Sequence, residues 1–147
     1  MPGYVIGFTS VAAAPGAPYF TFHTTTRQGY IWSVSYFLLD AASTAIAIVY
    51  PSNSPVASSS INPAKLNQDD AAPTCAADVA WTTTPTIPAP PVESFGDYNF
   101  GPAVGAGAID PVPQIRSIQV PKSSYLVWYN KGIVAGSRLA VTIRYEE

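Results

Sequence analysis

The sequence predicts an all-β protein, a two-layer antiparallel β-sandwich or jelly roll of about eight strands with long irregular loops. Three observations support this fold class. Fifteen prolines and ten glycines divide the 147 residues into short pieces. These pieces are rich in aromatic and β-branched residues, and none has the periodicity of an amphipathic helix. The length suits one domain, so we expect a single sandwich over residues 1–147.

Four strands are expected in the first third of the chain, at residues 4–11, 19–26, 30–39 and 43–50. The sequences APGAP and RQG separate the first three and are typical of turns, so we expect these strands to form two hairpins. The apolar residues of the third strand do not alternate cleanly with polar residues: Ile31, Val34, Phe37 and Leu38. This strand is therefore either buried on both faces or carries a bulge.

Two long segments, residues 51–73 and 85–110, are predicted to be irregular. The first is dominated by Ser, Pro, Asn and Ala, with at most one short helical turn at 64–67, and the second is rich in proline and then in glycine. Between them we expect another strand at 78–84. Because long connections without secondary structure of their own are usually functional, we expect both segments to act as interaction arms.

Regular alternation returns in the last third, where strands are expected at 115–120, 125–130 and 139–145. The last of these has the pattern of a strand with one buried face, formed by Leu139, Val141, Ile143 and Tyr145. A strand next to a chain end is ordered only when it is paired. We therefore expect it in an interior or well-paired position of a sheet.

Charge is scarce in this chain. Charged residues make up 11% of the sequence, against about 25% in typical globular domains. The formal net charge is −2 and the seven Lys and Arg residues are dispersed, so nucleic acid is not an expected partner. No apolar run approaches the roughly 20 residues of a membrane span. The opening MPGYVIGFTSV lacks the positive charge of a signal peptide, so we expect synthesis in a cytoplasm and no membrane partner.

The few titratable side chains predict no catalytic, cofactor-binding or metal site. His23 is the sole histidine and Cys75 the sole cysteine, so a zinc or copper site lacks ligands. Cys75 is expected to be a buried packing residue without a disulfide partner. An enzyme would require a pocket that holds His23 near a carboxylate. Asp69, Asp70 and Asp97 lack the spacing of a calcium loop. A glycosidase pair of Glu93 and Asp97 has no support except the presence of the two residues.

Three tryptophans and nine tyrosines can fill a core, an interface or a sugar-stacking platform. Trp128 shares one strand face with Leu126, while Tyr125, Val127 and Tyr129 occupy the other face, so this strand is expected to be covered on both sides. Interface cores are depleted in charge, and we therefore expect a homo-oligomer, most simply a trimer. The residues expected at interfaces are Trp128, Tyr125, Tyr129, Trp81, Pro55 and Val56.

The C-terminal stretch SIQVPKSSYLVWYNKGIVAGSRLAVTIRYEE resembles a pattern in small virion-associated proteins of tailed bacteriophages. In that pattern a strand, a turn, a strand ending in Asn and a short loop precede a final strand that closes on an aromatic residue and Glu-Glu. The stretch INPAKLNQDDAAPTCAADVAWTTTP is similar to their mid-chain segment. The resemblance covers under half of the chain, and Lys122 stands where the turn often has glycine.

The resemblance implies a β-sandwich that decorates or cements the phage head, binds the major capsid protein and is located in the virion. It implies no enzymatic activity and no cofactor. The alternative from another class is a carbohydrate-binding, lectin-like module or a tail-associated adhesion module. An exposed tryptophan or tyrosine platform lined with Asn, Asp or Gln would distinguish that alternative.

Overall fold

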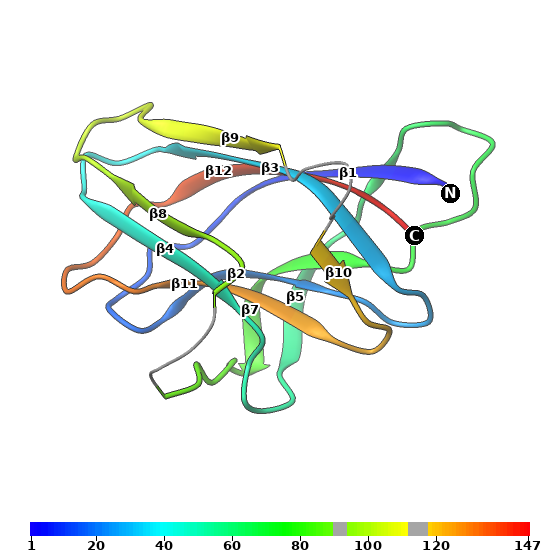
Figure 1. The fold of residues 1–147 in the computed structure, drawn as a ribbon, viewed down its shortest axis with the longest axis horizontal. Coiled ribbons are helices and arrows are strands. Elements are labelled where there is room, and N and C mark those ends of the chain that lie inside the picture. The colour runs from blue at the N-terminus through cyan, green and yellow to red at the C-terminus, as the bar shows by residue number, and fades with distance from the viewer. Residues whose placement is uncertain (90–93, 112–117) are drawn as a thin grey trace.

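The computed structural model describes residues 1–89, 94–111 and 118–147. These residues form twelve strands and no helix, and the strands make two antiparallel sheets that pack face to face (Figure 1). The all-β fold class and the two-layer sandwich predicted from the sequence are confirmed. The strand count was too low, because short strands form inside both segments that were predicted to be irregular.

Sheet A has the order β10-β3-β12-β1-β6, and β9 pairs with β3 beside β10. Its strands are β1 (Gly3–Thr9), β3 (Gly29–Leu38), β6 (Ala64–Lys65), β9 (Gly107–Pro111), β10 (Ile118–Val120) and β12 (Leu139–Glu146). Sheet B has the order β5-β7-β2-β11-β4-β8. Its strands are β2 (Pro18–His23), β4 (Thr44–Val49), β5 (Val56–Ile61), β7 (Ala76–Thr83), β8 (Asp97–Phe100) and β11 (Tyr125–Asn130).

The last strand, β12, lies between β1 and β3 and pairs with both along its length, which confirms its expected interior position. Its alternate residues face the core, since Leu139, Ile143 and Tyr145 have no exposed surface. Of the two alternatives given for this part of β3, the bulge is present. The register against β12 shifts between Arg144 and Tyr145, so that Trp32 is the extra residue of β3 and lies partly exposed.

The two hairpins predicted for the first three strands do not form. The chain passes from β1 in sheet A to β2 in sheet B and back to β3 in sheet A, so that no two of these strands pair with each other. Strand alternation shows which side chains are buried, but it carries no information on the partner strand. The turns APGAP and RQG therefore join the two layers instead of adjacent strands.

Both segments predicted to be irregular contain short strands. Residues 51–73 include β5 and β6, so the expected helical turn at 64–67 is replaced by β6. In the segment 85–110, of which residues 90–93 lie outside the described residues, the structure has β8 and most of β9. Strand β5 has the sequence VASSSI, which has low β-propensity, and it forms because it pairs with β7 through three register irregularities.

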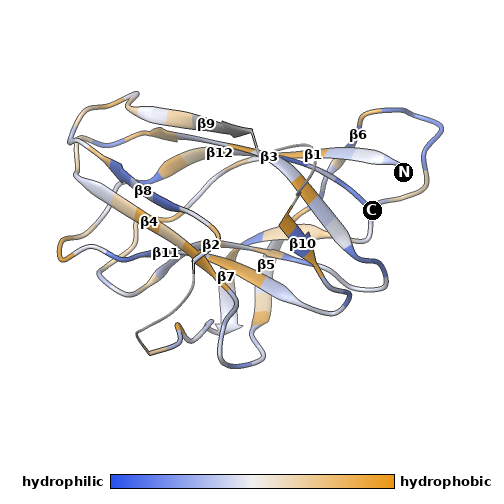
Figure 2. Cartoon of the chain, viewed as in Figure 1, coloured by the Kyte–Doolittle hydropathy of each residue, from blue (hydrophilic) through white to orange (hydrophobic). Residues whose placement is uncertain are grey.

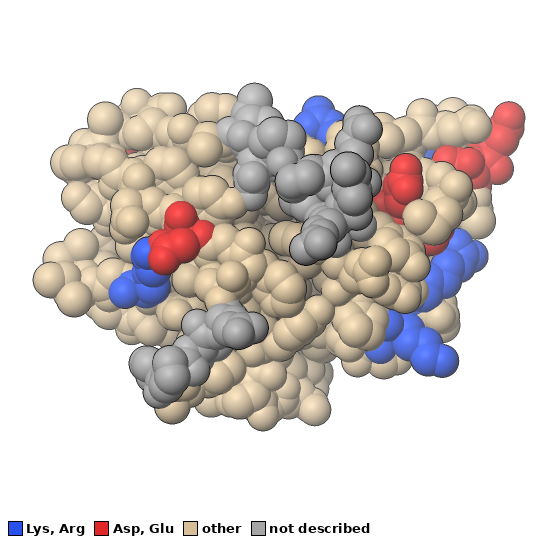
Figure 3. All heavy atoms as spheres, viewed as in Figure 1, with Lys and Arg blue, Asp and Glu red and all other residues tan. Residues whose placement is uncertain are grey.

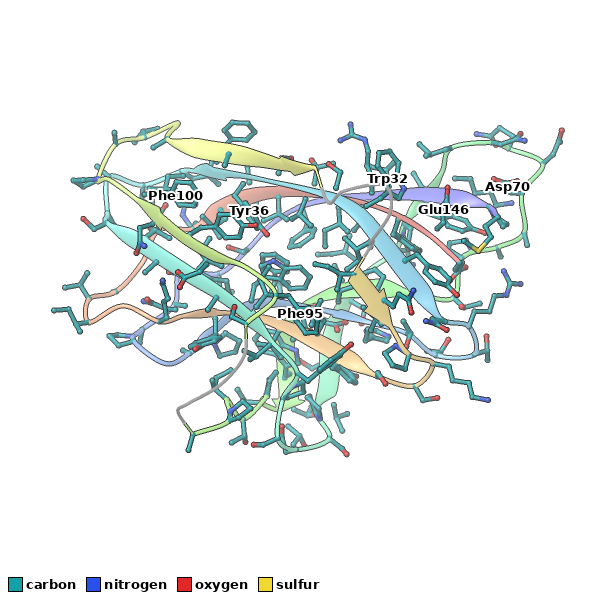
Figure 4. The ribbon with its side chains drawn as sticks, viewed as in Figure 1. Trp32, Tyr36, Asp70, Phe95, Phe100 and Glu146 are labelled. Carbon is teal, nitrogen blue, oxygen red and sulfur yellow. The ribbon has the colours of Figure 1, made fainter. Side chains whose placement is uncertain are left out.

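The core lies between the sheets and is rich in aromatic side chains. Phe20 stacks on Trp128 with ring centroids 4.6 Å apart and meets Phe8 edge to face at 5.1 Å. The Trp128 indole donates a hydrogen bond of 2.7 Å to the Tyr36 hydroxyl, which joins the two sheets across the core. Tyr36 extends into the space between the layers (Figure 4). Hydrophobic residues lie mainly in the strands, but the tip of the loop between β11 and β12 is also hydrophobic (Figure 2).

Two parts of the predicted arms lie on the outer face of sheet B of their own chain. The Ser52 amide donates to the Thr86 carbonyl at 2.9 Å, and the Asn53 side chain binds the Thr84 carbonyl at 2.9 Å and the Thr86 amide at 2.8 Å. Val127, which points to this outer face, has no exposed surface. On this face of β11, Val127 is thus covered within the chain, while Tyr125 and Tyr129 are partly exposed.

Candidate functional site

Four loops meet at one end of the sandwich, on the left in Figure 1. They are residues 10–17, 39–43, 101–106 and 131–138, and backbone hydrogen bonds connect them or their bases, such as Gly136 N to Ala13 O at 2.9 Å. Each loop exposes apolar side chains. We call this surface the apolar loop end and define it by Val11, Leu39, Val104, Ile133 and Val134.

The most exposed apolar side chain, Ile133, lies in a loop that is fixed from below. Its side chain is 93% exposed. The buried Asn130 side chain donates to the carbonyls of Val134 at 2.8 Å and Ala13 at 2.9 Å, and it accepts from the Gly132 amide at 2.8 Å. Gly136 lies so close to the Tyr19 hydroxyl that a Cβ atom would overlap it. The backbone on both sides of Ile133 is therefore held in place, and the Ile133 side chain projects from it.

The charged residues in these four loops are paired. Asp40 and Arg138 form a bidentate ion pair with contacts of 2.8 and 3.0 Å. Hydrogen bonds from the Arg138 guanidinium, and then from its backbone amide, lower the pKa of Asp40 to about 2. Lys131 pairs with Asp97 of β8. Because each charge has a partner, the exposed tips of the loops remain apolar and without net charge.

A cavity of about 270 Å³ opens beside the Ile133 loop. Phe100, Ile133 and Val134 supply its apolar wall, and Asn99 and Asn130 supply amides. Phe100 lies at the same end of the molecule as the loops (Figure 4). This end thus combines projecting aliphatic side chains with an adjacent cavity. A protein surface of complementary shape can pack against both.

The opposite end of the sandwich has a different composition. More charged side chains of the described residues gather there, on the right of the view, than at the left, where acidic and basic side chains lie side by side (Figure 3). A second cavity of about 270 Å³, which we call the Tyr50 pocket, lies between the chain after β4 and the turn before β11. Its lining residues are Tyr50, Pro51, Asn53, Ser54, Pro55, Ser123, Ser124 and Tyr125.

A polar network lies near the Tyr50 pocket, on the outer face of sheet B. Asp78 is fully buried. Its carboxylate accepts hydrogen bonds from Thr21 at 2.8 Å and Ser60 at 2.6 Å, and the His23 Nδ1 atom lies 2.7 Å away. His23 stacks on Tyr125 with ring centroids 5.1 Å apart. A buried carboxylate with three polar partners joins β5, β7 and β2 in place of the apolar contacts found elsewhere.

The His23–Asp78 pair meets part of the condition set for an enzyme, because a carboxylate that fixes an imidazole occurs in proton-transfer sites. The Tyr50 pocket is lined by Tyr125 and not by His23. The two residues lie 55 positions apart in sequence on the neighbouring strands β2 and β7, which their contact connects. Sequence analysis missed it, because no local pattern indicates that Asp78 faces His23.

A third polar cluster surrounds Glu147. Its carboxylate accepts from the Thr74 amide at 2.7 Å, the Thr74 hydroxyl at 2.9 Å and the Cys75 thiol at 2.9 Å, and Arg27 lies 3.7 Å away. Cys75 is buried, as expected from the sequence. Burial, followed by the neighbouring Glu147, raises the pKa of the thiol far above its ordinary value. Cys75 therefore stays protonated and unreactive.

The structure separates the six residues that were expected at interfaces. Trp128 belongs to the core, and Trp81 donates to the Thr21 hydroxyl at 3.0 Å beside the Asp78 network. Tyr125 and Pro55 line the Tyr50 pocket together. Tyr129 lines a different cavity with Pro85, and Val56 is exposed on the edge strand β5. The interface role of these residues stays a prediction.

The sequence analysis did not identify the apolar loop end. One signal was available, since KGIVAGS places Ile133 and Val134 between glycines in a loop, where polar residues are usual. The other tips are single apolar residues in separate loops, and nothing in the sequence indicates that they meet. Within the described ranges, no three His, Cys, Asp or Glu residues are close enough to hold a metal ion, and no helix could span a membrane.

No protein-family model, no curated protein and no solved structure matches this chain. The class of protein defined by the geometry is therefore a two-layer antiparallel β-sandwich with an apolar loop end and a polar, pocket-bearing end.

Proposed function

We propose that this chain is a non-enzymatic structural protein that docks on a larger protein assembly through its apolar loop end. The specific form of the proposal is a decoration or cement protein that binds the major capsid protein on the head of a tailed bacteriophage. The observation that carries it is the exposure of five aliphatic side chains from four loops at one end of the sandwich. Large exposed apolar patches usually mark interaction sites.

Two properties of the apolar loop end favour protein docking. Its loops are fixed by Asn130 and by the Asp40–Arg138 pair, so little conformational entropy is lost when a partner orders them. Its charges are already paired, so contact with a neutral surface leaves no uncompensated charge. The capsid as partner, the virion as location and the homo-oligomer, most simply a trimer, come from the sequence resemblance and the scarcity of charge.

Co-sedimentation with capsids assembled from the major capsid protein of the same source tests this proposal. Wild type is expected to pellet with the particles, and Ile133→Asp to reduce the bound fraction at least about tenfold, because a carboxylate replaces a buried apolar contact. Leu66→Asp is the matched control, since Leu66 is exposed at the other end and its change is expected to leave binding intact.

Three results would contradict parts of the proposal. Failure of wild type to pellet argues against the capsid as partner. Full binding by Ile133→Asp, with loss in Val56→Asp, assigns docking to the segment around β5 instead. Sedimentation of the purified protein as a single 15.5 kDa species at micromolar concentration argues against self-assembly.

A further inference from the structure

The Tyr50 pocket combines carbon surfaces with neutral hydrogen-bonding groups. Two aromatic rings and two pyrrolidine rings line it, from Tyr50, Tyr125, Pro51 and Pro55. One amide and three hydroxyl groups line it as well, from Asn53, Ser54, Ser123 and Ser124. No lining residue is charged, so a charged ligand would lose hydration without gaining a partner. A ligand with an apolar face, hydroxyl edges and no charge suits this lining.

We propose that the Tyr50 pocket binds one neutral saccharide unit, such as a hexose or an N-acetylhexosamine at the end of a glycan. The C–H face of a pyranose ring can pack on a tyrosine ring, while its hydroxyl groups bind the Ser54 hydroxyl and donate to the oxygens of the other serine hydroxyls, which keep free lone pairs. The cavity of about 270 Å³ is slightly smaller than the roughly 300–1,000 Å³ of pockets for drug-sized ligands. It therefore suits a single sugar ring.

The walls of the pocket are fixed before any ligand binds. The Tyr50 hydroxyl donates to the Gln119 carbonyl at 2.8 Å, and its ring meets Phe95 edge to face at 5.1 Å. Ser123 has φ of 55°, a left-handed conformation that is costly for serine. Its amide and its hydroxyl both donate to the Thr25 carbonyl at 3.0 Å. Such strain is typical of ligand-binding positions, and a fixed wall lowers the entropy cost of binding.

Polar groups at the rim remain available to a ligand. Tyr50 is 39% exposed, and Ser54 is exposed at the rim. Within the part of the chain that the structure describes, the Ser54 hydroxyl makes no hydrogen bond. The Asn53 side chain binds the backbone of Thr84 and Thr86, and this fixes the chain next to Ser54. Ser54 is thus the lining hydroxyl that is free to bind a sugar.

A proline-rich peptide is the competing occupant, because tyrosine- and proline-lined grooves also bind polyproline helices. Such a peptide needs an extended groove with several successive pockets, whereas this cavity is small and lies between two chain segments. The inference does not rest on capsid docking. The Tyr50 pocket lies at the end opposite the apolar loop end, so a docked protein would present it outward.

Titration of the 15N-labelled protein by NMR tests the inference, with the methyl glycosides of D-glucose, D-galactose, D-mannose and N-acetyl-D-glucosamine as probes. We expect at least one probe to shift the amide signals of residues 50–55 and 123–125, with a Kd on the order of 1 mM, as is typical of a single small ligand with few contacts. Tyr50→Ala is expected to weaken binding about tenfold, and Ser54→Ala a few-fold, from the lost ring and hydroxyl contacts.

Two variants serve as matched controls. Tyr50→Phe keeps the ring but loses the hydroxyl that holds it to Gln119, so its affinity for the sugar is expected to lie between those of wild type and Tyr50→Ala. Trp32→Ala removes an aromatic ring of similar exposure from sheet A and is expected to leave sugar binding unchanged. Circular dichroism spectra of each variant that match the wild type show that any loss of binding is not a loss of fold.

Several outcomes would overturn the inference. One is the absence of shifts in the pocket with all four probes. Others are unchanged sugar binding in both Tyr50→Ala and Ser54→Ala, or binding of D-glucuronic acid as tight as that of D-glucose. Pocket shifts caused by an oligoproline peptide and by none of the sugars would assign the pocket to a proline-rich partner.

Discussion

The two ends of the sandwich are built from the same kind of element, the turns between strands, but they use different chemistry. At the apolar loop end a neutral amide, Asn130, holds the loops and aliphatic side chains project into solvent. At the opposite end a buried carboxylate, Asp78, and the carboxylate of Glu147 hold the strands, and tyrosine and serine residues line a pocket. Each end has a fixed frame, and only the exposed groups differ.

This difference suits the two ends of the domain to different kinds of ligand. Apolar tips on a rigid base favour a permanent protein contact, since their burial releases water without breaking charge pairs. A small neutral pocket favours a weak, reversible ligand. Substitutions can change the hydrogen bonds that hold each end separately from the groups that the end exposes.

The largest effect is expected from the frame beside the Tyr50 pocket. Asp78→Ala leaves Thr21, His23 and Ser60 without their shared acceptor, so we expect it to lower the free energy of unfolding by about 3 kcal/mol. Urea denaturation measures this change. Asp78→Asn retains one acceptor oxygen and is expected to cost clearly less. A loss in Asp78→Ala below about 0.5 kcal/mol would show that the network does not stabilise the sandwich.

The frame of the apolar loop end is expected to contribute somewhat less. Asn130→Ala removes three hydrogen bonds from a buried position, and we expect a loss of about 2 kcal/mol. Amide hydrogen exchange should become faster in residues 131–137. Asn53→Ala is the control at the other end, where the amide is only partly buried and the expected loss is below about 1 kcal/mol. Equal losses would remove the contrast between a buried and a partly exposed asparagine.

The exposed groups themselves should contribute little to folding. Ile133→Ser changes a side chain that contacts almost nothing, so the free energy of unfolding of the variant is expected to stay within about 0.5 kcal/mol of wild type. Binding of a hydrophobic dye to the native protein should fall. Ile143→Ala provides the contrast, since Ile143 is fully buried and its truncation should cost about 2–5 kcal/mol. A clear loss of stability in Ile133→Ser would mean that Ile133 packs within the domain.

The smallest effect concerns the exposed ion pair beside the loops. The pKa of Asp40 is about 2 in the folded protein and 3.8 without its partner. Because the folded value is the lower one, the pair stabilises the fold above pH 3.8, and this contribution is lost as the pH falls toward about 2. NMR titration of the Asp40 carboxyl measures the midpoint. Arg138→Ala should return it toward 3.8; an ordinary midpoint in the wild type would show that the pair does not form.

Local sequence patterns determined the fold class and most of the strand positions of this protein. The alternation from Leu139 to Tyr145 correctly indicated a paired strand, and the break in alternation between Ile31 and Val34 spans the position of the bulge in β3. The abundance of proline and glycine excluded long helices. These inferences succeed because strand periodicity and turn chemistry are properties of neighbouring residues. The location of Trp128 on the core face with Leu126 follows from the same alternation.

Only the tertiary structure decided which strands pair and which side chains meet. The contact of Asn130 with Ala13 spans 117 residues, and that of His23 with Asp78 spans 55. Alternation does not encode such partners, because they depend on how the chain crosses between the two sheets. For the same reason, β5 and β8 form from weak sequences once neighbouring strands offer unpaired backbone groups. The apolar loop end and the Tyr50 pocket arise where separate turns converge, which no single segment of the sequence can specify.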